Sequence, residues 1–161
     1  MKYIENLCTQ LARPDKSVVE RIEFKIWIDK HYDNREQFGD EDGKRDGIDW
    51  DNIKKVVYDS LKHMVHYSSM VKGFSFVATG PKTGTVLRIV LPKEEEDGEM
   101  LNIAIEIRLI ELSIYELTVK TAKKTNYFRT ADGQYVIELI NESTSELKIF
   151  KEHKLQTISR I

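Results

Sequence analysis

Two kinds of hydrophobic spacing divide the chain. In the first half, apolar residues recur at steps of three and four, the repeat of one face of an α-helix. Residues 1–12 and 53–64 follow this pattern. The second run comes after Asp49, whose side chain can accept the free N–H groups of a first helical turn. Asp29 can cap a further short helix through Phe38 in the same way, so the sequence predicts a largely helical N-terminal half.

One strand is expected within this half. Ile22, Phe24, Ile26 and Ile28 alternate with more polar residues, as in a half-buried strand, and a continuous helix from Ser17 is the alternative. The glycine- and aspartate-rich residues 39–47 predict an exposed loop.

From Phe74 onward the apolar repeat changes to every second residue, which is typical of strands. Glycine, proline and aspartate separate the segments, and the short spacings favour an antiparallel meander without crossover helices. The expected strands are residues 74–79, 85–91, 101–110, 112–121, 134–140 and 145–150. The predicted fold class is α+β, with N-terminal helices packed on one apolar face of a multi-stranded antiparallel sheet and the other face open and charged.

Composition limits the classes of partner. The chain has 161 residues, so we expect a single domain over 1–161. Its 25 basic and 27 acidic residues give a formal charge of −2, so no global field attracts nucleic acid or an anionic membrane. An RNA site would have to be a local basic patch.

Cysteine content and hydropathy indicate the cellular compartment in which the protein is expected. Cys8 is the single cysteine, which excludes an intramolecular disulfide and a thiolate-rich zinc site. Neither a signal peptide nor a run of apolar residues long enough to span a bilayer is evident, so we expect a cytoplasmic protein without membrane contact. The motifs HExxH and GxSxG are absent, and no metal or cofactor is predicted.

Three of the four histidines lie in the first half, at His31, His63 and His66. Imidazole titrates near neutral pH, so two histidines that face one substrate can act as general base and general acid. Helical spacing places Arg35 one turn from His31, where its guanidinium could bind a phosphate. The alternative is that these are ordinary solvated residues of an exposed helix face.

Residues 120–130, at the end of the strand expected at 112–121, form a basic and aromatic segment. Lysine and arginine can contact phosphates while an aromatic ring stacks on an unpaired base, as in single-stranded RNA binding. The alternative is a solvated hairpin end whose lysines protect an edge strand. The candidate RNA-binding residues are Lys120, Lys124, Tyr127 and Arg129, with Arg108 on the polar sheet face.

The segments FKIWIDKHYDNR and GIDWDNIKKVVYDSLKH, followed by several strands, resemble the RegB-type phage endoribonucleases and, more distantly, the RelE and YoeB messenger-RNA toxins. The resemblance covers roughly residues 22 to 121. His31 and His63 match the positions of the two catalytic histidines of that family. The loop at residues 39–46 is longer than in the family pattern, the strands are more regular, and the segment at residues 130–140 has no counterpart in the family.

The resemblance implies a metal-independent endoribonuclease acting on messenger RNA by 2′-hydroxyl attack. One of His31 and His63 would take the proton of the ribose 2′-hydroxyl, and the other would protonate the leaving 5′-oxygen. His66 is the reserve candidate. Arg35, Arg108 and Lys120 would stabilise the negative charge on the phosphorus. The alternative hypothesis is a non-catalytic phage or regulatory protein. It would bind RNA or a host protein, such as a translation factor or ribosomal protein in the host cytoplasm, through its charged sheet face or an exposed strand edge.

Overall fold

The computed structural model describes residues 15–19, 22–28, 50–74, 87–111 and 113–161. The helices expected over residues 1–12 and from Asp29 to Phe38 lie outside these ranges, as do the glycine-rich loop and nearly all of the strand expected at residues 74–79. His31 and Arg35 are also outside the described residues.

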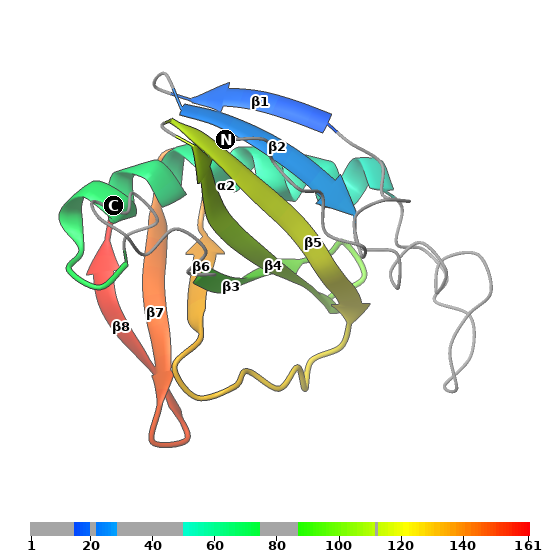
Figure 1. The fold of residues 1–161 in the computed structure, drawn as a ribbon. Helices are drawn as coiled ribbons and strands as arrows, with labels where there is room; N and C mark the ends of the chain where they lie inside the picture. Colours follow the sequence, from blue (N-terminus) through cyan, green and yellow to red (C-terminus); the bar gives the residue numbers. More distant parts are fainter. Residues whose placement is uncertain (1–14, 20–21, 29–49, 75–86, 112) are drawn as a thin grey trace.

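Most of the described chain belongs to one sheet of eight strands in the order β1-β2-β5-β4-β3-β6-β7-β8 (Figure 1). Two neighbouring pairs, β2 with β5 and β3 with β6, are parallel, and the other five pairs are antiparallel. The sheet is therefore mixed. The strands are β1 Asp15–Val19, β2 Ile22–Ile28, β3 Leu87–Glu94, β4 Met100–Glu111, β5 Ile114–Lys124, β6 Tyr135–Leu139, β7 Ser145–Lys151 and β8 Lys154–Arg160.

The predicted fold class is wrong in two respects. The described residues contain a single helix where several were expected, and the sheet is not antiparallel throughout. The expected meander holds from β3 to β5 and again from β6 to β8, and it is broken between β5 and β6. After β5 the chain crosses to the other side of β3 and forms β6 there. The two strands are parallel, with Ile89 opposite Tyr135 and Val90 opposite Val136. A connection over residues 125–134 suffices without a helix because the sheet is strongly twisted between β3 and β6 (Figure 1).

The helix α2, Trp50–Met70, connects β2 to β3. These two strands run in the same direction, so the chain must return along the sheet between them, and α2 crosses one face of the sheet as it does so (Figure 1). Ile53, Val57, Leu61 and Met64 are fully buried against the sheet, which confirms the predicted helix and its apolar stripe. In the part of the chain that the structure describes, no helix is both long and apolar enough to cross a membrane.

The alternation predicted for the strands is confirmed on the helix side of the sheet. Phe24, Ile26 and Ile28 of β2 are buried in the same core as Leu117 and Val119 of β5. Their neighbours in sequence lie on the opposite face, because side chains alternate along a strand.

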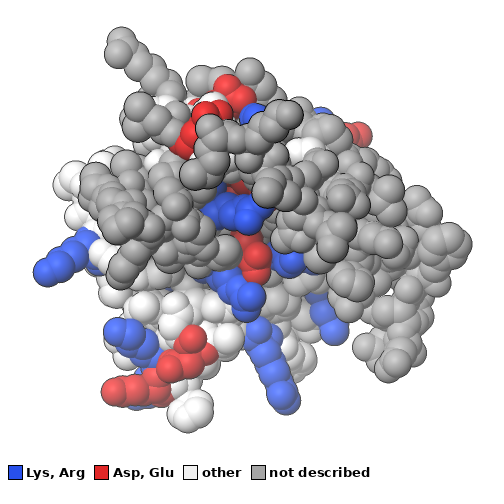
Figure 2. Space-filling view, viewed as in Figure 1, with Lys and Arg blue, Asp and Glu red and all other residues white. Residues whose placement is uncertain are grey.

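The prediction that this opposite face is open is wrong at its centre. Val90, Glu116 and Thr118 belong to it, and each of them is buried. Charged side chains of both signs gather along the middle of this face (Figure 2). Two ion pairs bridge its strands, Arg88 to Glu106 and Arg108 to Glu116.

Candidate functional site

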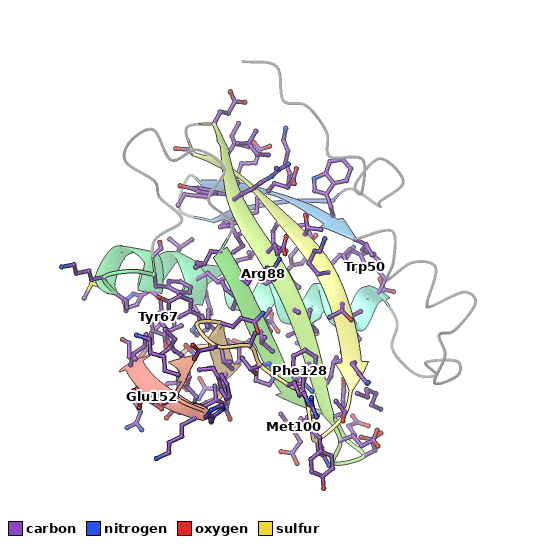
Figure 3. The ribbon with its side chains drawn as sticks, turned by 60° about the horizontal axis from the view of Figure 1, so that its bottom comes forward. Trp50, Tyr67, Arg88, Met100, Phe128 and Glu152 are labelled. Carbon is purple, nitrogen blue, oxygen red and sulfur yellow. The ribbon has the colours of Figure 1, made fainter. Side chains whose placement is uncertain are left out.

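The histidine proposed for catalysis, His63, lies in the second half of α2 with only 2% of its surface exposed. Its Nδ1 atom is 2.9 Å from the hydroxyl of Ser145, the first residue of β7, and its Nε2 atom is 3.1 Å from the backbone carbonyl of Glu142. Tyr67, one turn further along α2, donates to the Ser145 carbonyl at 2.9 Å. Figure 3 shows Tyr67 between α2 and the hairpin that carries Glu152.

These contacts determine the protonation of the His63 ring. A carbonyl only accepts hydrogen bonds, so Nε2 carries the proton that is donated to Glu142. In the neutral ring, Nδ1 then accepts from the hydroxyl of Ser145. Burial lowers the pKa of His63, against the opposing effect of the Glu142 hydrogen bond. The neutral imidazole thus joins α2 to β7 with both nitrogens engaged, a geometry that does not favour proton exchange with a substrate.

An open cavity of about 200 Å³ lies beside this group and is lined by Lys62, His63, His66, Glu142, Ser143 and Ile161. The His66 ring is exposed and meets the Tyr67 ring edge-on at 6.0 Å between centroids. The cavity therefore brings together two of the predicted catalytic residues. Among the described residues, no group of three histidine, cysteine or acidic side chains is arranged to hold a metal ion.

The sheet face opposite α2 holds the most perturbed carboxyl group of the described residues. Glu116 of β5 has a side chain with 4% exposure, and its Oε1 atom accepts from Arg108 Nε at 3.1 Å and Nη2 at 3.0 Å. No described residue donates to the other oxygen, Oε2. Burial raises the pKa of Glu116 to about 7, although the positive charge of Arg108 favours the ionised carboxylate.

The predicted RNA-binding residues do not form one free basic surface. Arg108 is held by Glu116, and Lys124 lies 2.7 Å from Asp97 and 3.9 Å from Glu99 in the acidic turn between β3 and β4. These carboxylates would repel a phosphate backbone at the same place. Lys120, at an irregularity in the pairing of β4 with β5, is half-buried.

Tyr127 and Arg129 lie in the connection from β5 to β6. Tyr127 is 91% exposed and Arg129 is also exposed. They are the two predicted RNA-binding residues whose side chains are open to a ligand, because the other three are at least half-buried.

The last strand, β8, lies at an edge of the sheet, and among the described residues it pairs with β7 alone. Glu152 and His153, with φ of 51° and 62°, make the two-residue turn that joins β7 to β8. The resulting hairpin projects beyond the rest of the sheet (Figure 1). Six of the seven β8 side chains are exposed, among them Leu155 at 48% and Ile158 at 43%.

Hydrogen bonds between β7 and the residues just before β6 show which β8 backbone groups are directed outward. Phe150 of β7 uses both of its backbone groups toward β6, donating to the Gln134 carbonyl at 3.0 Å and accepting from the Gly133 N–H at 2.8 Å. Leu155, opposite Phe150, therefore exchanges no bond with it and directs its own N–H and C=O away from β7. Thr157 does the same, because backbone direction alternates along a strand.

Several of these residues were not found from the sequence. The strand β8 was missed, because its mostly polar, exposed side chains give little hydrophobic alternation. Ser145 and Tyr67 gave no signal of their own, because only the fold brings them within bonding distance of His63.

The fold and these sites define an α+β protein with a twisted, eight-stranded mixed sheet crossed by one described helix and ending in an exposed edge strand. Compared with known proteins, the chain matches no family model, no curated protein and no solved structure. The resemblance to the RegB-type endoribonucleases stays a prediction.

Proposed function

We propose that this protein is a non-catalytic interaction protein that binds an extended segment of a partner protein as an additional strand alongside β8. The observation that carries the proposal is the exposed outer edge of this strand. Its backbone N–H and C=O groups at Leu155 and Thr157 are directed away from β7 and can pair with a further strand.

The side chains of β8 support the same function. Leu155 and Ile158 leave nearly half of their surfaces exposed on a hairpin that projects from the sheet. An incoming strand would cover part of this apolar surface and satisfy the backbone groups at the same time. Main-chain hydrogen bonds supply affinity in this mode of recognition, and alternate side chains supply specificity.

The test compares Thr157→Pro, which removes an outward N–H, with Thr157→Ala, which keeps it. The wild-type protein is used to select binders from a library of random linear peptides. We expect the selected peptides to slow hydrogen exchange at the Leu155 and Thr157 amides and to bind Thr157→Ala but not Thr157→Pro. Selected peptides that bind both variants equally would refute the proposal, as would a chain that cleaves RNA and selects no such peptide.

The carboxyl group of Glu116 favours a second candidate, the metal-independent endoribonuclease. A carboxyl group with a pKa of about 7 can accept the proton of a ribose 2′-hydroxyl at neutral pH, and Arg108 next to it can stabilise negative charge on phosphorus. In this form of the proposal Glu116 takes the role first given to His63, with His31 as the second group. It ranks below strand addition because the Glu116 side chain is almost fully covered.

The ribonuclease candidate is tested by incubating the protein with cellular RNA in EDTA. Loss of cleavage in Glu116→Gln and in His31→Ala, with retention in His63→Ala, would support it. No cleavage by the wild-type chain would leave strand addition as the proposed function.

A further inference from the structure

The charge pattern of the β7–β8 hairpin points to the chemistry of the partner, an inference that rests on the proposed strand addition. Lys148 and Arg160, near the base of the hairpin, are already paired with carboxylates. Lys148 contacts Glu138 at 2.6 Å, and Arg160 contacts Glu146 at 2.9 Å. This part of the hairpin is close to neutral.

The end of the hairpin is different. Lys151 and Lys154 lie directly opposite each other in the register of β7 and β8, and both side chains are exposed. No carboxylate of the described residues forms an ion pair with either lysine. Two like charges in a cross-strand pair destabilise each other, so a carboxylate brought to this position is favoured.

The backbone limits where a partner strand can pair. The outward groups at Leu155 and Thr157 are two residues apart, and the pairing of β7 with β8 is irregular at the next residue, Ile158. An irregularity of this kind bends the strand and interrupts a regular ladder. The contact is therefore confined to the stretch from Lys154 to Thr157, where an apolar partner side chain can pack on the exposed Leu155.

We infer that β8 binds an extended, acidic segment of another protein, with a carboxylate beside Lys154 and an apolar residue beside Leu155. A second copy of this chain is a poorer occupant. The strand β8 contains no aspartate or glutamate, so self-pairing would supply no carboxylate to Lys154.

The test uses three synthetic peptides of about eight residues in which valine alternates with glutamate, with threonine or with lysine. Binding to the full-length protein is measured by fluorescence anisotropy. We expect the glutamate peptide to bind best and the lysine peptide not to bind. Lys154→Glu should weaken binding of the glutamate peptide by about tenfold, because it replaces attraction by repulsion.

Lys123→Glu is the matched control. It changes the net charge equally at an exposed position of β5, four strands away from β7 in the sheet order. It should change binding less than about twofold, and an effect as large as that of Lys154→Glu would show nonspecific attraction and overturn the inference.

The remaining outcomes separate this inference from the proposed function. Equal binding of the glutamate and threonine peptides, lost in Thr157→Pro, would overturn the acidic partner and leave strand addition intact. Binding of all peptides that survives in Thr157→Pro would overturn both. A concentration-dependent dimer in sedimentation that Thr157→Pro abolishes would identify a second copy as the occupant and overturn the acidic partner.

Discussion

Glu116 provides the sharpest test of the energetics of this fold, through the substitution Glu116→Gln. Glutamine has nearly the same shape as a protonated glutamate and cannot ionise. Its carbonyl oxygen can still accept from Arg108, which holds Oε1 in the wild-type protein. The substitution therefore removes the burial of charge and leaves most of the packing unchanged.

The magnitude follows from the shift in pKa. Burial raises the pKa of Glu116 from the ordinary value of 4.5 to about 7, so the folded state holds the proton more tightly than the unfolded state. The stability associated with this group is complete below about pH 4.5 and is lost as the pH rises through about 7. At 1.36 kcal/mol for each pKa unit, the wild-type protein loses about 3 kcal/mol over this interval, whereas Glu116→Gln does not.

The assay is urea unfolding of both proteins at about pH 4.5 and about pH 8. Subtracting the two pH-dependent changes cancels every other titrating group that the proteins share. We expect the variant to gain about 3 kcal/mol relative to the wild type between the two conditions. A difference of zero would show that the ion pair with Arg108 offsets the cost of burial, and a variant that becomes relatively less stable at the higher pH would show that the ion pair outweighs it. Either result would refute the reasoning.

Three further predictions concern α2 and the C-terminal hairpin. Tyr67→Phe removes the hydroxyl that donates to Ser145 and should lower the free energy of unfolding in urea by about 1 kcal/mol; an unchanged value would mean that this bond contributes nothing. Burial lowers the pKa of His63, so the stability that the neutral ring contributes is present above the ordinary pKa of 6.5 and is lost as the pH falls below it. His63→Gln should therefore flatten the fall in the free energy of unfolding on acidification. Curves of stability against pH that run parallel for the two proteins would contradict this. In thermal unfolding, Thr157→Pro should cost about 1 kcal/mol or less, and Gln156→Pro about 3 kcal/mol, because only the Gln156 N–H bonds to β7; equal losses would show that the backbone directions are wrong.

Periodicity predicted the elements of this fold better than their arrangement. The alternation through Phe24, Ile26 and Ile28 predicted β2, and the repeat from Ile53 to Met64 predicted α2, since both patterns depend on residues close in the sequence. The strand β8 was missed, because an exposed edge strand has little hydrophobic alternation to reveal it.

The candidate sites show the same limit. The sequence placed Arg108 on the polar sheet face, but its pairing with Glu116 depends on the register of β4 with β5. Whether His63 is available for chemistry depends on Glu142 and Ser145, about eighty positions further along the chain. No local pattern contains that information.

By itself, the sequence determined that the segments of β2 to β7 are strands, that the segment of α2 is a helix, and which side of each is apolar, because the geometry of a strand or a helix repeats over a few residues. Only the tertiary structure decided that β6 lies beside β3, that Glu116 is buried, that His63 has both ring nitrogens engaged and that β8 is an edge. These features arise from contacts between distant segments, and burial, strand pairing and shifts in pKa are set by those contacts.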